Sequence, residues 1–482
     1  MQPLMKSLVN RPLILTLLGA ICLTGCKGDL ESLTRYTASM LCSKMLVGEQ
    51  GFDKVVEEDL TIITDGAVEF ATLKVDSAKG TVRSSAFFEH ATAVYREGVG
   101  CTLVGSEGEQ ALRDQAIPDV PKQTLSATTP WPYGSAGATE LAGFDYTGFA
   151  TSADYHFTEH GDKQVKSSSL AIAYQGQLIY EKYEEGISSS TPIFSFSLGK
   201  TIAALFTGIL VQDNLLDLHA PTGLPEWAND ERSAITPHHL LTMSSGLEWN
   251  EIPDDPTSDA GSLFFQHDIA SYASDKPLVA EPGTVYNYST GNTMILSKVI
   301  KNALGGELAG PYKLLHESLL RKLMMNNAVV QADASGSLVL GGQVLMGTHD
   351  LLRLGQFLLQ DGQWNGEQVV PDGWLDYMST PIELTTPRGF DYGSGIWLNS
   401  AENGKAFFSS LPADTLIGYG WRGQFIIAVP SMELVIVRTG NSMVGEASGL
   451  FPEINRLVAD IVLALSKADI DQGGLGDNYL YY

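Results

Sequence analysis

Cysteine is scarce in this sequence, and the patterns of common metal sites are missing. The 482 residues include four cysteines and nine histidines, and neither Cys-x-x-Cys nor His-Glu-x-x-His occurs. Those spacings are typical of structural zinc sites and of zinc peptidases. The Gly-x-Ser-x-Gly elbow of the α/β-hydrolases is missing as well. We therefore expect no metal and no organic cofactor, and any serine chemistry must use another arrangement.

Positive charge is also scarce. The chain has 30 Lys and Arg residues against 56 Asp and Glu residues, which gives a formal net charge of −26. Nucleic-acid phosphates and anionic lipid surfaces repel such a chain, so nucleic acid is not an expected partner. The 44% of hydrophobic residues and 18% of charged residues are instead typical of a globular protein with a large core.

Long hydrophobic runs are missing beyond the first 25 residues. Lys6 and Arg11 precede an apolar run at 13–23 that is too short to span a bilayer, and Leu-Thr-Gly-Cys then ends at Cys26. This order is typical of a secretory signal at 1–25, and its ending resembles a bacterial lipobox. We expect Cys26 to carry a lipid anchor on the periplasmic face of the cell envelope, at the outer membrane. The alternative is an ordinary signal peptide with an incidental cysteine.

Two cysteines remain once Cys22 leaves with the signal and Cys26 takes lipid. In an oxidising compartment Cys42 and Cys101 are expected to form a disulfide, which would close a long loop in the first part of the mature chain. Two free buried thiols are the alternative.

The mature chain divides into parts with different patterns. Helical apolar spacing over 30–46 and strand-like stretches at 67–75 and 80–87 predict a small α+β module at 26–125. The stretch 126–164 begins rich in Pro, Gly, Ser and Thr, which is typical of an extended linker. The main domain is expected at 165–465, followed by a tail at 466–482.

The main domain has strands at both ends and helices in the middle. A hairpin is predicted at 169–183, and late strands at 423–429 and 434–438. Helices are predicted between them, at 195–211, 236–247, 292–304, 312–325 and 349–359. This order predicts an α+β fold in which both chain ends contribute to one sheet.

A serine and a lysine stand three residues apart where a turn gives way to an apolar helix. If a helix opens at Ser197, Lys200 lies on the same face one turn later, and its amine can reach the hydroxyl. A serine nucleophile needs an adjacent base, and burial at a helix N-terminus disfavours the charged form of lysine. Chance alone gives about one such spacing in a chain of this composition. The surrounding motifs must decide between catalysis and an incidental pair.

Further motifs follow in the order of a known superfamily. They are the segment 235–247, Pro-Gly-Thr-x-x-x-Tyr-Ser at 282–289, the segment 350–355, and Gly-x-x-Gly-Gln at 420–424 followed by Pro430. With Ser-x-x-Lys, they make the chain resemble the serine β-lactamase and penicillin-binding-protein superfamily. It is most similar to the class C β-lactamase-related branch, with its family VIII carboxylesterases and 6-aminohexanoate-oligomer hydrolases. The likeness implies a β-lactamase-like fold, with an antiparallel sheet, helices on both faces and an all-helical region.

The resemblance also implies roles for individual residues. Ser197 is the acylated nucleophile, Lys200 the neighbouring base or proton relay, and Tyr288 the group that passes a proton to the leaving group. A core tyrosine is the alternative for Tyr288. Thr290 stands two residues later, where the family has an asparagine, and Asn292 is the candidate replacement for that side-chain contact.

The third motif of the family is altered. Trp421, Arg422 and Gly423 stand where true β-lactamases have Lys-Thr-Gly, and we expect them on a strand. The backbone N–H groups of Gln424 and Ser197 would then hold the oxyanion. Trp421 would form an apolar wall of the acyl pocket, and Arg422 would point to the other face of the sheet. Without the lysine that recognises a substrate carboxylate, esters or linear amides are favoured over anionic penicillins.

Two other functions remain open. One is a β-lactamase or D,D-peptidase acting on cell-wall peptides, and the other is a catalytically silent binding protein of the envelope. Intact Ser197, Lys200 and Tyr288 argue against silence. His238 and His239 are expected to pack or cap a helix and not to catalyse.

Overall fold

The computed structural model describes residues 25–158, 165–253, 255, 257–263, 265–402, 404–442 and 449–472. The predicted signal peptide lies outside the described residues except for Gly25, and so does the side chain of Cys26. None of the described helices has the length and hydrophobicity needed to cross a membrane.

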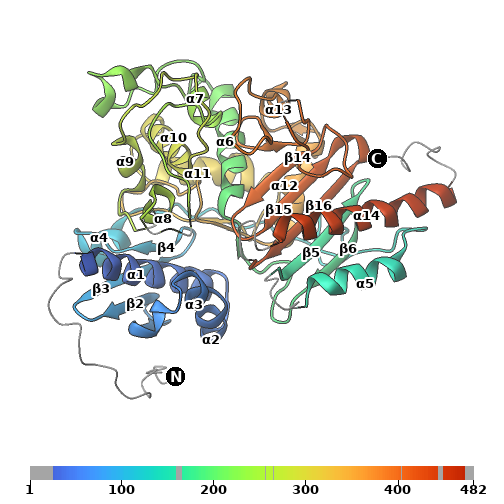
Figure 1. Ribbon diagram of the computed structural model, residues 1–482, viewed down its shortest axis with the longest axis horizontal. Coiled ribbons are helices and arrows are strands. Elements are labelled where there is room, and N and C mark those ends of the chain that lie inside the picture. The colour runs from blue at the N-terminus through green and yellow to red at the C-terminus, as the bar shows by residue number, and fades with distance from the viewer. Residues whose placement is uncertain are drawn as a thin grey trace.

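A seven-stranded antiparallel sheet forms the centre of the main domain (Figure 1). Its order is β12-β13-β14-β15-β16-β5-β6, so strands from both ends of the domain lie side by side, as predicted. The strands are β5 (Ser167–Tyr174), β6 (Gln177–Tyr183), β12 (Asp391–Tyr392), β13 (Trp397–Leu398), β14 (Leu416–Gly420), β15 (Gln424–Val429) and β16 (Leu434–Gly440).

Helices cover both faces of this sheet. Alternate residues of its strands enter two different cores: Val435 and Val437 of β16 pack in one, and Leu434 and Ile436 in the other. The first core includes α12 (Thr348–Leu359), and the second includes α14 (Leu450–Gln472) and α5 (Tyr146–His156). α14 continues into the stretch that we assigned to a tail.

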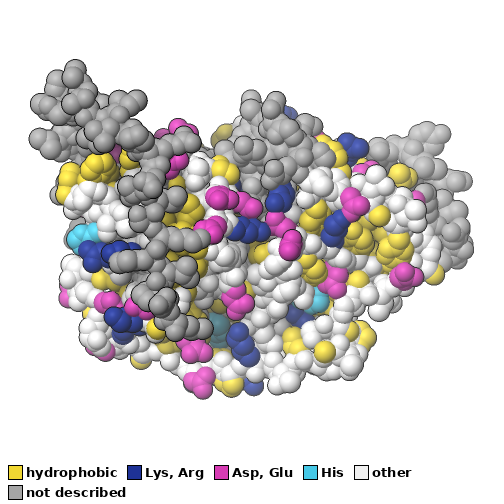
Figure 2. Space-filling model, turned by 90° about the horizontal axis from the view of Figure 1, so that it is seen from below, with side chains coloured by type: hydrophobic (Ala, Val, Ile, Leu, Met, Phe, Trp, Pro, Cys, Tyr) yellow, Lys and Arg dark blue, Asp and Glu magenta, His cyan; other side chains and the backbone are white. Residues whose placement is uncertain are grey.

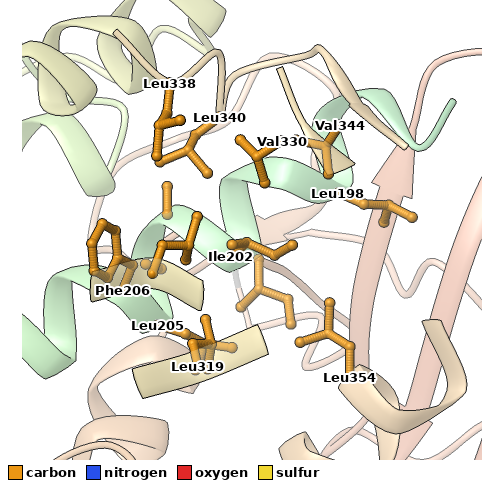
Figure 3. Close-up of a cluster of buried hydrophobic side chains, with 14 of the residues drawn as sticks. Leu198, Ile202, Leu205, Phe206, Leu319, Val330, Leu338, Leu340, Val344 and Leu354 are labelled. Atoms are coloured by element: carbon orange, nitrogen blue, oxygen red, sulfur yellow. The ribbon is translucent and has the colours of Figure 1, made fainter. Parts of the chain in front are cut away.

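A helical region packs beside the sheet around α6 (Gly199–Gln212) (Figure 1). Figure 3 shows Ile202, Leu205 and Phe206 of α6 in a cluster that also includes Leu319 and Leu354 from other helices, with Leu205 beside Leu319. The remaining helices here are α7 (Pro237–Leu241), α8 (Asp259–Leu263), α9 (Ile269–Ser274), α10 (Thr290–Ala303), α11 (Ala309–Leu315) and α13 (Trp374–Ser379). Short strands complete the domain: β7 (Ile193–Phe194), β8 (Val329–Val330), β9 (Val344–Met346), β10 (Gln363–Trp364) and β11 (Glu367–Gln368).

The N-terminal module has its own four-stranded antiparallel sheet, in the order β1-β2-β3-β4. Its elements are α1 (Gly25–Cys42), α2 (Phe52–Val55), α3 (Thr61–Ile63), β1 (Thr72–Asp76), β2 (Thr81–Ala86), β3 (Glu89–Arg96), β4 (Gly100–Leu103) and α4 (Gly108–Asp114). A disulfide between Cys42 and Cys101 joins α1 to β4. α1 also contacts the main domain, because Arg35 donates a hydrogen bond of 2.6 Å to the carbonyl oxygen of Phe265.

The stretch 126–164 differs from the extended linker that we predicted. Trp131 is buried, and Arg353 of α12 donates hydrogen bonds to the carbonyl oxygens of Pro132 and Gly134. The second half of the stretch forms α5, which Asp145 caps by accepting a hydrogen bond from the backbone of Gly148. Its apolar residues pack on the sheet, which is why a polar, loop-like sequence folds here.

Candidate active site

Ser197 lies in a single 3₁₀ turn, Phe196–Leu198, between β7 and α6. The residue before it, Phe196, has a φ of 48°, which is unfavourable for a bulky side chain. Packing holds Phe196 in place, because its ring stacks on Phe194 and meets Trp421 edge-on, each at 5.1 Å between centroids. Strain of this kind, about 1–3 kcal/mol, is commonly concentrated at functional sites. Ser197 is half-buried, whereas its neighbours Phe196 and Leu198 are buried.

Lys200 stands one turn later and reaches Ser197, as its spacing predicts. Its Nζ lies 3.0 Å from Ser197 Oγ, 2.9 Å from Thr290 Oγ1 and 3.0 Å from the carbonyl oxygen of Gly341. The side chain is 2% exposed. Burial lowers the pKa of Lys200 to about 8, although the negative charge of Glu251 opposes this shift. Lys200 is thus a cation that loses its proton readily.

Tyr288 lies beside this pair. Lys200 Nζ is 4.9 Å from the centre of the Tyr288 ring, and that ring stacks on Trp397 at 5.3 Å. Burial and the charge of Glu251 raise the pKa of Tyr288, and its hydrogen bond with Ser197 only partly offsets this. Tyr288 is therefore a neutral phenol at ordinary pH and can donate a proton, whereas Lys200 is the group that can accept one.

Thr290, which stands where the resemblance implies an asparagine, contacts Lys200 directly. Lys200 donates to Thr290 Oγ1, and Thr290 Oγ1 in turn donates to the carboxylate of Glu251. Asn292 is not in this position: it is buried in α10, where its Oδ1 accepts a hydrogen bond of 2.8 Å from Ser245. The candidate replacement was unnecessary because threonine offers both an acceptor and a donor.

Glu251 is the residue of this site that the sequence did not reveal. Its carboxylate also accepts hydrogen bonds from the backbone of Thr290, at 2.8 Å, and from Trp249 Nε1, at 2.5 Å. It lies in a loop outside any motif, so no local signal could have identified it. The hydrogen-bonded path runs Ser197, Lys200, Thr290, Glu251.

The third motif forms a turn and not the strand that we predicted. Trp421–Gly423 connects β14 to β15, and Arg422 and Gly423 have φ values of 64° and 88°. Trp421 contacts Phe196 and a hydrophobic cluster of the N-terminal module. Trp397 and Tyr392, which sequence reasoning missed, form the aromatic wall beside Tyr288.

Arg422 also differs from our expectation, because it points into the N-terminal module. Its Nη1 donates a hydrogen bond of 2.9 Å to Asp59, whose second oxygen lies 2.7 Å from Lys44 Nζ. All three side chains are buried. The cation in the third motif is therefore neutralised by another part of the chain.

Strand β14 closely approaches the nucleophile. A Cβ at Gly420 would lie 2.3 Å from the carbonyl oxygen of Ser195, so only glycine fits there. Gln424, expected to contribute an oxyanion N–H, pairs with Gly420 at the start of β15. The Gln424 side chain is occupied elsewhere: its Nε2 donates to the carbonyl oxygen of Gly440, at 2.6 Å. The role of its backbone N–H stays a prediction.

The histidines have structural roles. The Nδ1 of His239 accepts a hydrogen bond from the backbone of Thr236 in a capping box at the start of α7, and His238 Nδ1 lies 2.9 Å from the Tyr377 hydroxyl. Over the part of the chain that the structure describes, no group of three or more His, Cys, Asp or Glu side chains could hold a metal ion.

Comparison with known proteins agrees with this geometry. The family model described as beta-lactamase matches residues 153–460, which is more than half of the chain. The chain belongs to the beta-lactamase family. It is thus placed among the serine hydrolases of that fold, as the resemblance implied.

Relatives within the beta-lactamase family include named hydrolases. The 6-aminohexanoate-dimer hydrolase of Paenarthrobacter ureafaciens is 23% identical over 302 residues, which cover 57% of this chain and 73% of that protein. A putative 6-aminohexanoate-dimer hydrolase from Bacillus anthracis shares the fold, with a TM-score of 0.58, 18% identity, and coverage of 75% of this chain and 92% of that one. A family VIII carboxylesterase also shares it, with a TM-score of 0.51, 17% identity, and coverage of 68% and 99%.

Proposed function

We propose that this protein hydrolyses esters or linear amides through an acyl-enzyme intermediate on Ser197. The observation that carries the proposal is the distance of 3.0 Å between Lys200 Nζ and Ser197 Oγ, made by a lysine that is 2% exposed. With a pKa of about 8, about a tenth of Lys200 is neutral at pH 7, which supplies a base next to the nucleophile.

In the acylation step, neutral Lys200 accepts the proton of Ser197 while Oγ bonds to the substrate carbonyl carbon. The carbonyl π electrons move to oxygen, where backbone N–H groups such as that of Ser197 hold the oxyanion. When the tetrahedral intermediate collapses, the bond to the leaving oxygen or nitrogen breaks and the Tyr288 phenol donates a proton to it. Lys200, now an ammonium, returns a proton to Tyr288. The net result is that the Ser197 proton leaves with the alcohol or amine.

Deacylation uses the same groups in reverse. Neutral Lys200 or the path through Tyr288 accepts a proton from water, and the resulting hydroxide attacks the acyl carbon. The bond to Ser197 Oγ breaks, the acid departs, and the serine regains a proton. No group beyond Ser197, Lys200 and Tyr288 has to change its protonation state.

The substrate class follows from the third motif. Arg422 is the cation of that turn, and it is paired with Asp59 inside the protein. It therefore does not supply the charge that would hold a substrate carboxylate, whereas the half-buried Trp397 offers aromatic surface beside Tyr288. This favours neutral acyl groups. One relative is named for hydrolysis of a 6-aminohexanoate dimer and one structural neighbour for carboxylester hydrolysis, which supports the same classes.

The test compares three probes on the purified protein: p-nitrophenyl butyrate, nitrocefin and a fluorophosphonate label. We expect ester turnover and labelling in the parent, and neither in Ser197→Ala. Ser188→Ala, which removes an exposed hydroxyl nine residues upstream, is the matched control and should behave like the parent. Absence of labelling and turnover in the parent would leave a catalytically silent envelope protein. Nitrocefin turnover far above ester turnover would instead support a β-lactamase or D,D-peptidase.

We further propose that the protein is anchored by lipid at Cys26 on the periplasmic face of the outer membrane. The support is the order of Lys6, Arg11, the apolar run 13–23 and Leu-Thr-Gly-Cys. Mass spectrometry of the mature N-terminus provides the test. A diacylated or triacylated Cys26 is expected, and an unmodified N-terminus beyond Cys26 would refute the anchor.

A further inference from the structure

Three exposed phenylalanines distinguish the surface of the N-terminal module. Phe70 is 67% exposed, Phe87 79% and Phe88 62%. Phe87 and Phe88 form the two-residue turn between β2 and β3, and Phe87 has a φ of 52°. Turns of this kind favour Asn or Gly at such an angle, so a phenylalanine here is unfavourable for the turn itself. The sequence places an aromatic pair at the tip of a hairpin at a cost to local stability.

The strand register brings Phe70 to the end of the sheet where Phe87 and Phe88 form the turn. Thr72 of β1 pairs with Ser85 of β2. Two residues before Thr72 is Phe70, and two residues after Ser85 is Phe87. Phe70 ends the 3₁₀ turn that leads into β1, so it lies at the same end of the sheet as the turn of Phe87 and Phe88.

Basic side chains lie on the outer face of the sheet next to these rings. Lys74 pairs across the strands with Arg83, and both are exposed. His90, also exposed, pairs with Ser85 on the same face. Glu69 is the exposed carboxylate next to Phe70. Figure 2, which views the molecule from the side of this module, shows hydrophobic side chains at the left edge beside a histidine and basic side chains. Asp76 lies on the same exposed face two residues after Lys74, so the cations and carboxylates around the rings are close to balance in a chain with a net charge of −26.

The direction of α1 places the entry of the chain at this same end. The Cys42–Cys101 disulfide fixes the end of α1 near Tyr95, which pairs with Cys101. Earlier in α1, Thr37 Oγ1 donates a hydrogen bond of 2.8 Å to Ser84 Oγ, three residues before the aromatic turn. Following α1 backwards thus leads toward the turn, and the helix extends about 18 Å further to Gly25. Cys26, the proposed site of the lipid anchor, therefore belongs to the first turn of α1 at this end of the module.

We propose that Phe70, Phe87 and Phe88 dock the N-terminal module onto a lipid bilayer surface. Aromatic rings are stable at the boundary between headgroups and acyl chains, and nearby cations bind headgroup phosphates. Rings at the tip of a convex hairpin suit a soft, deformable partner better than a rigid protein surface. The lipid anchor proposed at Cys26, in the first turn of α1, would bring a membrane close to the rings. This surface is independent of the chemistry proposed for Ser197.

The test measures flotation of the protein with vesicles while no lipid anchor is present. The chain begins at residue 26 and carries Cys26→Ser, so that every residue described from there on is kept. The vesicles are phosphatidylethanolamine with phosphatidylglycerol, and phosphatidylcholine alone. The variant F70S/F87S/F88S is compared with L215S/V279S/L463S, which removes three other exposed apolar side chains that are 43%, 66% and 57% exposed.

We expect the parent and the matched control to float with both vesicles, and F70S/F87S/F88S to lose at least about tenfold in partitioning. Melting temperatures near that of the parent show that each variant is folded. This readout does not depend on ester hydrolysis by the protein. A parent that does not float, or an aromatic variant that floats like the parent, would refute the proposal. A parent dimer in sedimentation velocity that F70S/F87S/F88S abolishes would assign the patch to a second copy of the chain and equally refute it.

Discussion

Lys200 and Tyr288 differ in what burial does to them, and this difference assigns their roles. Loss of solvation disfavours the charged form of each group, so the pKa of Lys200 falls to about 8 and that of Tyr288 rises. The lysine becomes a base near neutral pH while the tyrosine remains a proton donor. Glu251 acts on both through its negative charge, raising both pKa values.

The first prediction concerns pH. Below its pKa of about 8, Lys200 is protonated and cannot take the Ser197 proton, so labelling by a fluorophosphonate should slow about tenfold per pH unit as the pH falls from 7.5 to 5.5. Above about pH 8 the rate should level off. A rate that is constant from pH 5.5 to 8 would mean that Lys200 is not the base. Lys200→Arg, which stays charged, should not be labelled at any of these pH values.

The second prediction concerns Glu251. Glu251→Gln removes a negative charge that favours the ammonium of Lys200, so the pKa seen in the labelling profile should fall by about one pH unit. Tyr286 and Tyr392, which surround the site from other elements, have pKa values raised by burial and stay neutral over this range. Thr290→Ser keeps the hydroxyl, so its labelling profile should resemble that of the parent. Thr290→Val lacks the hydroxyl, so its labelling profile should differ from that of the parent. An unchanged profile in Glu251→Gln would mean that the carboxylate only supports the loop.

At the scale of single residues, the sequence predicted the contacts between residues that are close together in the chain. Ser197 and Lys200 are three residues apart on one helical turn, so the spacing alone could predict their meeting. Glu251 and Thr290 meet through hydrogen bonds between segments 39 residues apart. Such contacts depend on how two loops fold over each other, and no periodicity encodes that.

Among the elements, the β14–β15 hairpin connects the two parts of the chain. Its turn carries Trp421 and Arg422 into the N-terminal module, while Gly420 in β14 touches the backbone beside Ser197. Residues Trp421, Arg422 and Gly423 were expected on a strand. They form a turn because their partners, Asp59 and the aromatic cluster around Phe196, come from outside the hairpin. α5 was missed for the same reason, since its apolar face is stabilised by the sheet and not by its own sequence.

The third prediction tests this connection. Asp59→Asn leaves Lys44 and Arg422 as buried cations without a carboxylate, and should lower the free energy of unfolding by about 3–5 kcal/mol. Lys44 already has a lowered pKa from burial, which Asp59 opposes, so the loss of Asp59 lowers that pKa further. Denaturant unfolding measures the stability, and ester kcat/KM should fall with it as the turn loosens.

The matched control is Glu367→Gln, which removes an exposed carboxylate that pairs with Lys322 at the surface. It should cost less than about 1 kcal/mol. Equal decreases in the free energy of unfolding of the two variants would mean that burial of Asp59 does not increase its contribution to stability.

Across the whole molecule, the α+β architecture was predictable and the placement of the N-terminal module was not. Strand-like ends and a helical middle predicted one sheet with helices around it, and the motif order indicated the family. No pattern in residues 26–125 indicated that the module packs behind the nucleophile, where its cluster includes Phe194, Phe196 and Leu345. The spacing of apolar residues within each folding unit does not indicate which residues of the other unit it contacts.

The fourth prediction is made for the disulfide that holds the module together. Cys42 and Cys101 are 59 residues apart, and closing such a loop reduces the entropy of the unfolded chain. Cys42→Ala with Cys101→Ala should therefore lower the free energy of unfolding by about 2–4 kcal/mol. Thermal unfolding of the two proteins under non-reducing conditions measures this. A reductant should destabilise the parent and leave the double variant unchanged; equal sensitivity would show that another effect is at work.

The pairing of β5 with β16 also has a consequence for biosynthesis. Ser169 of β5 and Thr439 of β16 are hydrogen-bonded neighbours separated by 270 residues of chain. At about 5–20 residues per second, β5 leaves the ribosome roughly 15–50 s before its partner exists. During that time a strand made largely of buried apolar residues has an open edge. The N-terminal module, whose four strands pair only with their neighbours in sequence, needs no such wait and can fold first.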